Sequence, residues 1–254
     1  MNMTTTTDIN NTPQTGSLAG WLVGWIDRPA ATFQAVLTRR KWWVWLTPLL
    51  IVLAAFAILT AIQAPYSLEM AQEQAEIRLA QLPPEQVEAA RAGMEKTMTL
   101  PFMTATALGF GVVALLFSLL AQATFLYFGS LVSGGDDMRF GQMFTLSAYT
   151  RLPLALSFLA QAGFILITHH LLQQPGLSFL VSTGDLLQDA RNPLFVLLGT
   201  LDLFWLWHLL LVGIALSAAA RLGWAKALLL TLLYAAIWLG ATVAPTLIVS
   251  WMMP

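Results

Sequence analysis

The segment from Asn192 to Leu222 constrains the fold of this chain most, because it is long and apolar yet carries a carboxylate. It exceeds the roughly 20 mostly apolar residues that a helix needs to cross a bilayer. Asp202 and His208 lie inside it. A carboxylate is costly in contact with lipid, so this one should face other helices or water. The segment therefore predicts the central helix of a multi-span bundle.

One face of this expected helix carries Asp202 together with small residues. At about 100° per residue, that face collects Gly199, Asp202, Leu206, Leu209, Gly213 and Ala220. Small residues let a neighbouring helix approach closely. Asp202, beside Trp205 and Trp207, has two interpretations: a functional proton relay or headgroup ligand, or a neutral structural group. His208 lies about 120° further around, so we expect it to donate a hydrogen bond within the bundle.

Composition supports the membrane class and excludes several kinds of function. Only 10% of residues are charged, against about a quarter in a soluble domain. A net charge of −1 argues against a nucleic-acid partner. The absence of cysteine excludes thiolate metal sites and thiol nucleophiles. With no HExxH, Walker A or GxSxG motif, we expect a non-enzymatic protein without cofactor or metal.

The pair His169–His170 is a candidate metal site. Adjacent residues point in different directions on a helix, so the pair is poorly spaced, even with Asp185 and Asp189 nearby in sequence. No metal is therefore predicted here.

Five apolar runs predict five transmembrane helices, at about 42–62, 102–128, 152–168, 192–222 and 225–249. Eight basic residues then fall on the side of the N-terminus: Arg28, Arg39, Arg40, Lys41, Arg139, Arg151, Arg221 and Lys226. Four fall on the other side: Arg78, Arg91, Lys96 and Arg191. The positive-inside rule predicts a cytoplasmic N-terminus and an extracytoplasmic C-terminus, in a plasma or inner membrane.

The chain before the first span divides into two parts. Residues 1–16 are polar and are expected to be disordered. Residues 17–41 are expected to form an amphipathic interfacial segment, since apolar side chains recur at helical spacing: Leu18, Trp21, Leu22, Trp25 and Ile26. We interpret this segment as an anchor rather than a partner-docking helix. Residues 42–254 form the membrane domain.

Two connecting segments carry helical patterns of their own. Residues 65–101 are rich in good helix formers on both sides of Pro83 and Pro84, which predicts an extracytoplasmic helical hairpin that caps the bundle. The other segment follows Gly134, which permits a tight turn. Its apolar spacing predicts a second interfacial helix, which enters the third span at Tyr149 and Pro153.

The chain contains a short internal sequence similarity between FSLLAQATF (117–125) and LSFLAQAGF (156–164), with six of nine positions identical. The two copies lie in spans of opposite direction, which makes Gln122 and Gln161 candidates to meet across an interface. The similarity cannot be extended to the length of a transporter repeat.

Taken in order, several segments resemble the Yip domain family (Ypt/Rab-interacting proteins) of polytopic membrane proteins, in its prokaryotic form. They are DRPAATF (27–33), GGDDMRFGQMF (from Gly134), AYTRLP (148–153), DLFWLWHLLLVGIAL (202–216) and WAKAL (224–228). The resemblance covers residues 20–250 and implies five spans and a membrane-organising or trafficking role. Eukaryotic members are associated with Rab-type GTPases. Their Asp-Leu-Tyr-Gly-Pro signature is absent here, which argues against a GTPase partner.

The leading functional hypothesis is therefore a non-enzymatic scaffold that shapes or organises membranes. Its partners would be membrane lipids, other proteins or further copies of the chain. The alternative is a lipid or small-molecule transporter, or a scramblase, with a polar furrow lined by Asp202, His208, Gln122 and Gln161.

Overall fold

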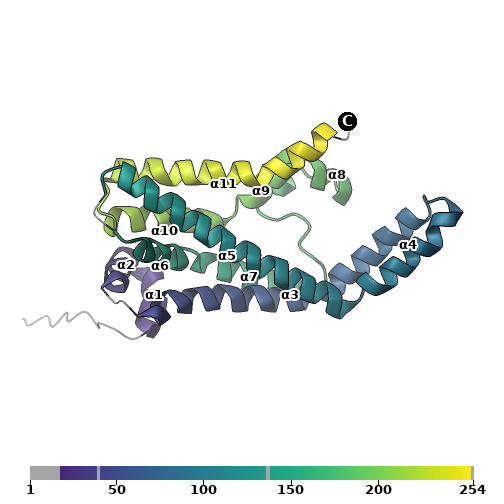
Figure 1. Cartoon of the computed structure of the whole chain (residues 1–254), viewed down its shortest axis with the longest axis horizontal. Coiled ribbons are helices and arrows are strands. Elements are labelled where there is room, and N and C mark those ends of the chain that lie inside the picture. Colours follow the sequence, from purple (N-terminus) through teal and green to yellow (C-terminus); the bar gives the residue numbers. More distant parts are fainter. Residues whose placement is uncertain (1–17, 39–40, 136–137, 253–254) are drawn as a thin grey trace, which may run out of the picture.

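The chain folds into a bundle of long helices (Figure 1). The computed structural model describes residues 18–38, 41–135 and 138–252, and all regular structure within them is helical. The predicted all-α class is confirmed. Within these described residues, four helices are long and apolar enough to cross a membrane, and a bent pair makes a fifth if it counts as one span. The four are α3 (Trp42–Leu79), α5 (Leu100–Val132), the joined α6 and α7 (Phe140–Thr168) and α11 (Trp224–Met252).

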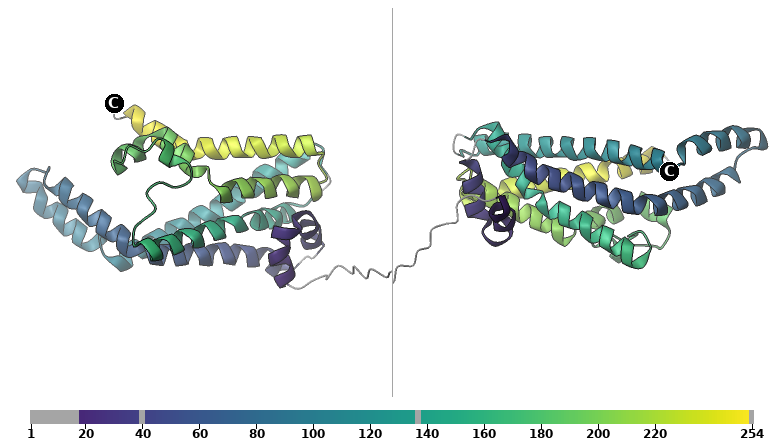
Figure 2. Two further views of the ribbon diagram at one scale, coloured as in Figure 1. Left: turned by 180° about the vertical axis from the view of Figure 1, so that it is seen from behind. Right: turned by 90° about the horizontal axis from the view of Figure 1, so that it is seen from below.

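Two short helices, α1 (Leu18–Asp27) and α2 (Pro29–Leu37), pack on one end of the bundle, and α1 runs across the long helices (Figures 1 and 2). Pro29 starts α2, where its missing N–H costs least. Phe33 of α2 is fully buried. Trp25 of α1 stacks on Trp207 with ring centroids 4.7 Å apart, and Gln34 Nε2 donates to the Ala218 carbonyl at 3.2 Å. The amphipathic segment is thus docked on the bundle. Residues 1–17 lie outside the described part of the chain.

The first long helix continues past its expected end. α3 passes through Pro65 without ending and continues to Leu79, because the following residues are strong helix formers. α4 (Pro84–Thr97) returns beside the end of α3, so the hairpin consists of an extension of α3 and one further helix. The hairpin projects beyond the bundle, and none of the α4 residues is buried (Figures 1 and 2). The expectation that it caps the bundle is wrong.

The segment expected as a second interfacial helix is α6 (Phe140–Thr150). It is helical as predicted, but its second half is buried against other helices, α2, α3, α5 and α10 among them. Only Arg151 separates α6 from α7 (Leu152–Thr168). Before α6 the chain turns at Gly134, whose φ of +77° suits glycine. The sequence also favours Asp136 or Asp137 as the cap of this helix, but residues 136–137 lie outside the described residues, and the N-cap position is held by Arg139.

The fourth span is broken, which corrects the prediction of one continuous helix. α9 (Pro193–Thr200) and α10 (Leu203–Ala218) meet at an angle of 63°. Asp202 lies at the break with extended backbone, and its carboxylate accepts a hydrogen bond of 2.6 Å from the Trp205 N–H. Aspartate is among the most favourable N-cap residues, because its oxygen satisfies a free N–H of the first turn. Asp202 therefore begins a helix instead of lying within one.

The chain between α7 and α9 folds against this break. It contains a short 3-10 helix, η1 (Ser178–Leu180), and α8 (Leu186–Arg191). Leu177 N donates to the Leu198 carbonyl at 2.9 Å, which satisfies one acceptor at the end of α9. Gly176 has φ +57°, and a Cβ there would lie 2.8 Å from the carbonyl oxygens of Leu198, Gly199 and Leu201. Only glycine allows this approach.

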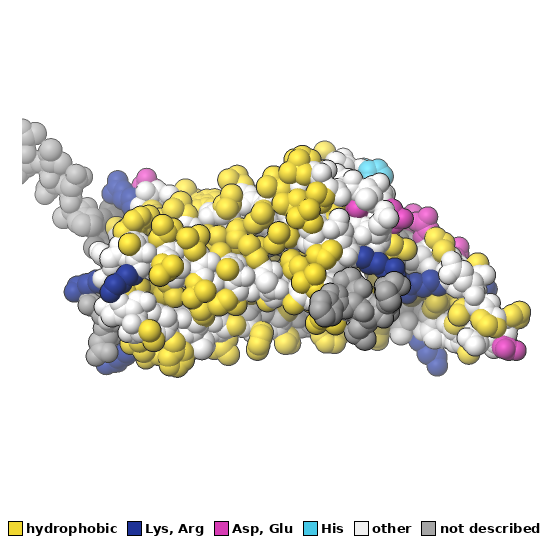
Figure 3. Space-filling model, turned by 90° about the horizontal axis from the view of Figure 1, so that it is seen from above, with side chains coloured by type: hydrophobic (Ala, Val, Ile, Leu, Met, Phe, Trp, Pro, Cys, Tyr) yellow, Lys and Arg dark blue, Asp and Glu magenta, His cyan; other side chains and the backbone are white. Residues whose placement is uncertain are grey.

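The surface has the pattern of a membrane protein. A band of apolar side chains covers the middle of the face in Figure 3, with Lys and Arg at the α1–α2 end and both acidic and basic side chains towards the hairpin end. The positive-inside count includes Arg151 on the cytoplasmic side, but Arg151 is 7% exposed and lies among the helices. Without it, the sequence-based count for that side falls from eight basic residues to seven. The orientation stays a prediction.

We predict that Gly176→Ala lowers the thermal unfolding midpoint more than Gly184→Ala. Both glycines have positive φ, so both substitutions carry the left-handed penalty of about 1 kcal/mol. At Gly184 nothing lies within 4 Å of an added Cβ, whereas at Gly176 three carbonyl oxygens do. Thermal unfolding of both purified variants in detergent measures the difference. Equal midpoints for the two variants would show that the loop at Gly176 is not packed closely against the α9–α10 break.

Candidate functional site

A buried arginine lies at the centre of the polar interior. Arg151 donates from Nε to Gln122 Oε1 at 2.7 Å. Its Nη1 donates to Ser118 Oγ and, at 3.5 Å, to the Leu115 carbonyl. These acceptors are all neutral groups on α5. The guanidinium carbon also lies 5.9 Å from the centre of the Trp238 ring. Across the described residues, no carboxylate lies within salt-bridge distance of Arg151.

Further hydrogen bonds tie this arginine to three other helices. Gln122 Nε2 donates to Thr150 Oγ1 at 2.9 Å. The Thr150 carbonyl lies 2.7 Å from His208 Nδ1, and His208 Nε2 lies 3.2 Å from the Tyr234 hydroxyl. A carbonyl can only accept, so Nδ1 carries a proton; in the neutral ring, Nε2 then accepts from Tyr234. Buried polar groups of α5, α6, α10 and α11 are thus joined in one network.

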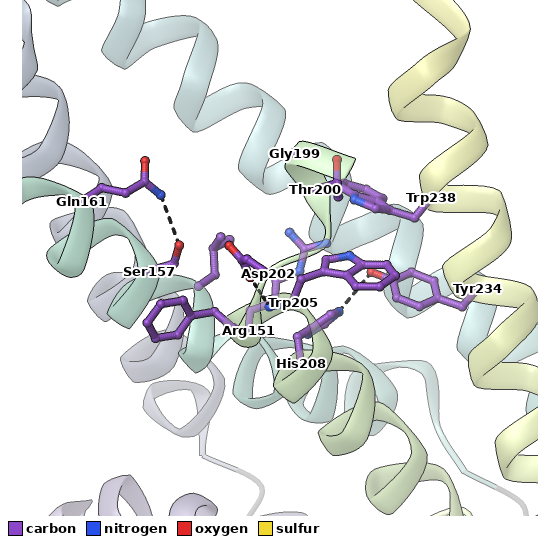
Figure 4. A pocket seen from close by; sticks show the side chains of 12 residues that line it. Arg151, Ser157, Gln161, Gly199, Thr200, Asp202, Trp205, His208, Tyr234 and Trp238 are labelled. Carbon is purple, nitrogen blue, oxygen red and sulfur yellow. Dashed lines mark hydrogen bonds between the residues drawn. The ribbon is translucent and has the colours of Figure 1, made fainter. Parts of the chain in front are cut away.

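A cavity of about 240 Å³ opens beside this network (Figure 4). Its walls come from the first part of α7 with the preceding Arg151, the broken pair α9–α10, and α11. Its polar lining consists of Arg151, Ser157, Gln161, Thr200, Asp202, His208 and Tyr234. Apolar and aromatic walls are supplied by Leu154, Phe204, Trp205 and Trp238. The cavity contains one cationic and one anionic side chain, which suits binding of a charged polar group.

Four residues singled out by sequence line this cavity: Asp202, Trp205, His208 and Gln161. Gln161 donates to Ser157 Oγ, one turn earlier on its own helix, at 3.1 Å. Gln122 lies behind Arg151 and is 1% exposed. The two glutamines therefore bond to different partners and do not form a pair.

The other sequence candidates lie away from the cavity. Trp207 stacks on Trp25 instead of lining it. Tyr149 and Pro153 are buried in the packed interior, and the Tyr149 hydroxyl has no hydrogen-bond partner among the described residues. Gly134 belongs to the turn after α5.

Sequence reasoning missed the most important member of the site. The sequence pattern places Arg151 where the chain enters the third span, and the positive-inside count assigns it to the cytoplasmic side. Tyr234, Trp238 and Thr200 were also missed, since each belongs to an ordinary apolar helix pattern. One signal was available: Arg151 has no charged neighbour, and apolar helical sequence flanks it on both sides. An ionisable residue in such a setting is a functional-site candidate.

The acidic residues near His169–His170 have other roles. Asp185 accepts hydrogen bonds from Leu187 N and Gln188 N at the start of α8. His169 Nδ1 lies 3.3 Å from the Tyr66 hydroxyl. Within the described chain, no group of three or more metal-ligating side chains has the geometry of a metal site.

Asp189 organises the loop that packs against the α9–α10 break. Its carboxylate accepts from Ser182 Oγ at 2.6 Å and from both the N–H and the hydroxyl of Thr183 at 2.8 Å. The bond from Ser182 is the main cause that holds the pKa of Asp189 below its ordinary value, and the bonds from Thr183 add to it. The ionised carboxylate is therefore the form that the folded loop favours.

We predict that Asp189→Asn reduces the pH dependence of stability. A pKa lowered by folding contributes stability that is present above the unfolded value of about 3.9 and is lost as pH falls through the folded value. Thermal unfolding at pH 7 and at pH 3 should show a larger drop for the wild type than for Asp189→Asn. Ser182→Ala, which removes the strongest donor, should lie between them. An equal drop in the unfolding midpoint between pH 7 and pH 3 for all three proteins would contradict this role of Asp189.

The comparisons with known proteins identify the family. The family model described as the Yip1 domain matches residues 23–244, which includes all the residues of the cavity and of its hydrogen-bond network. Neither the curated proteins nor the solved structures contain a match. The matched region covers most of the chain, and the chain therefore belongs to the Yip1 domain family of membrane proteins.

Proposed function

We propose that this protein is a non-enzymatic membrane-organising protein whose α1–α2 end acts as a wedge in one leaflet. The observation that carries the proposal is the docking of α1 and α2 on the end of the bundle. Trp25 and Phe33 are buried against it, while Val23 and Ile26 of α1 are 62% and 55% exposed. An amphipathic helix held across the spans in this way adds volume at headgroup depth.

The exposed apolar residues of α1 are accompanied by basic ones. Arg28 lies between α1 and α2, where it also pairs with Asp27 at 3.3 Å, and Lys41 precedes α3. Apolar side chains favour the acyl boundary, and burying each Val or Ile contributes about 1.5–3 kcal/mol. Basic side chains favour the anionic surface of a cytoplasmic leaflet. Both terms support insertion of this end into the interface.

The transport alternative has less support. It requires a polar furrow that includes Gln122, but Gln122 is enclosed behind Arg151 by hydrogen bonds to Arg151 and Thr150. The polar lining is concentrated in one cavity at the α9–α10 break. Binding at a site fits this arrangement better than passage along a path.

We predict that Val23→Gln with Ile26→Gln weakens membrane remodelling without lowering the unfolding midpoint, because both side chains are exposed. Vesicles reconstituted with wild type should be smaller or more tubular, by cryo-electron microscopy, than those with the double variant.

The matched control is Ile77→Gln with Leu82→Gln. These residues are also exposed, 57% and 36%, but lie on the projecting hairpin. This variant should remodel vesicles like the wild type. Equal remodelling by the α1 variant, or vesicles unchanged by the wild type, would refute the wedge.

A further inference from the structure

We propose that the cavity at the α9–α10 break binds a small zwitterionic group, with its anion at Arg151 and its ammonium at Asp202. Such a group is carried by an aminophospholipid headgroup or by a free aminoalkyl phosphate. This inference does not depend on the wedge, because it concerns the interior of the bundle and different residues.

The first argument is the state of Arg151. An arginine side chain carries its positive charge in proteins and presents a planar fork of donors that matches phosphate and carboxylate. Here it is 93% buried, given its exposure of 7%, and its hydrogen-bond acceptors are neutral. Neutral acceptors position the guanidinium but do not neutralise it. An isolated charge among apolar helices is costly, and an anionic ligand removes that cost.

The second argument is the state of Asp202 in the same cavity. One carboxylate oxygen caps α10 by accepting from Trp205 N. No salt bridge joins Asp202 to Arg151, or to any other described cation. A purely anionic ligand would bring a second negative charge towards this carboxylate. A zwitterion instead places its ammonium beside Asp202, and the Trp205 ring in the cavity wall adds a surface that attracts cations.

The third argument is the shape and polarity of the cavity. Its volume of about 240 Å³ is below the range of drug-sized sites, so it suits a headgroup or a similarly small solute. Around the two charges stand neutral polar groups, Ser157, Gln161 and Thr200, which can bond to further ligand oxygens (Figure 4). A broken helix whose two ends meet at a polar site is also a recurrent way to bind charged groups within a membrane.

The test compares four probes on purified protein in detergent: two soluble compounds, O-phosphorylethanolamine and inorganic phosphate, and two lipids, phosphatidylethanolamine and phosphatidylglycerol. Isothermal titration calorimetry measures the binding of the soluble probes, and native mass spectrometry measures the binding of the lipids. We expect a compound with both charges to bind at least about tenfold more tightly than phosphate alone or than phosphatidylglycerol. Binding of the free compound but not of the lipid would identify a soluble zwitterion; binding of the lipid, with or without the free compound, would identify a headgroup.

The decisive variant is Asp202→Asn, because asparagine caps a helix as well as aspartate and the fold is preserved. This variant should bind the zwitterionic probe about tenfold more weakly than the wild type does. Its affinity for phosphate should be unchanged or higher. Asp185→Asn is the matched control, since Asp185 caps α8 in the same way but does not line the cavity. It should bind like the wild type.

Three results would overturn the proposal. They are no binding of any probe by the folded wild type, equal affinity for zwitterion and plain anion, and unchanged zwitterion affinity in Asp202→Asn. Arg151→Lys provides a further check, because it keeps the charge but loses the fork of donors. Weaker binding of both phosphate and the zwitterion is expected, and full affinity in this variant would also overturn the assignment of the anion to Arg151.

Discussion

The interior of this bundle depends on accommodating one guanidinium away from water. Arg151 lies where α6 passes into α7, and α5 supplies acceptors to it from Leu115, Ser118 and Gln122. Gln122 also bonds to Thr150, whose carbonyl meets His208 on α10. Each of these groups is satisfied only while α5, α6 and α10 stay together. The same bonds that hold the arginine therefore also determine how the helices pack.

The broken fourth span completes this arrangement. Because Asp202 starts a new helix, the chain turns by 63° and leaves a cavity between α7, α9, α10 and α11. The loop around Gly176 supports the break from outside by bonding to the end of α9. A continuous helix would bury an uncapped carboxylate in the bundle. The break instead gives that carboxylate a backbone partner and a place in the cavity wall.

The two ends of the molecule differ in a way that suits different tasks. At one end, α1 and α2 are fastened to α10 by aromatic stacking and by the Gln34 hydrogen bond. At the other, the hairpin of α3 and α4 projects without burying any residue of α4. A wedge requires a rigid attachment, because a loosely tethered helix inserts without imposing its geometry on the spans. The first end has that attachment through packing on the bundle, whereas the second continues α3 but packs no residue of α4 into the bundle.

The sequence by itself determined the helical membrane class, the apolar segments that form the long helices, the amphipathic pattern of α1 and the resemblance to the Yip family. These are properties of residues close along the chain, which periodicity and hydropathy detect. Only the tertiary structure decided that Arg151 lies inside the bundle, because its acceptors are 29 to 36 residues away on another helix. The tertiary structure also decided the role of Asp202. The local sequence is compatible with Asp202 inside a continuous apolar helix and with Asp202 as an N-cap, and the fold selects the N-cap. The break became favourable there because the Gly176 loop, a separate segment, satisfies the end of α9.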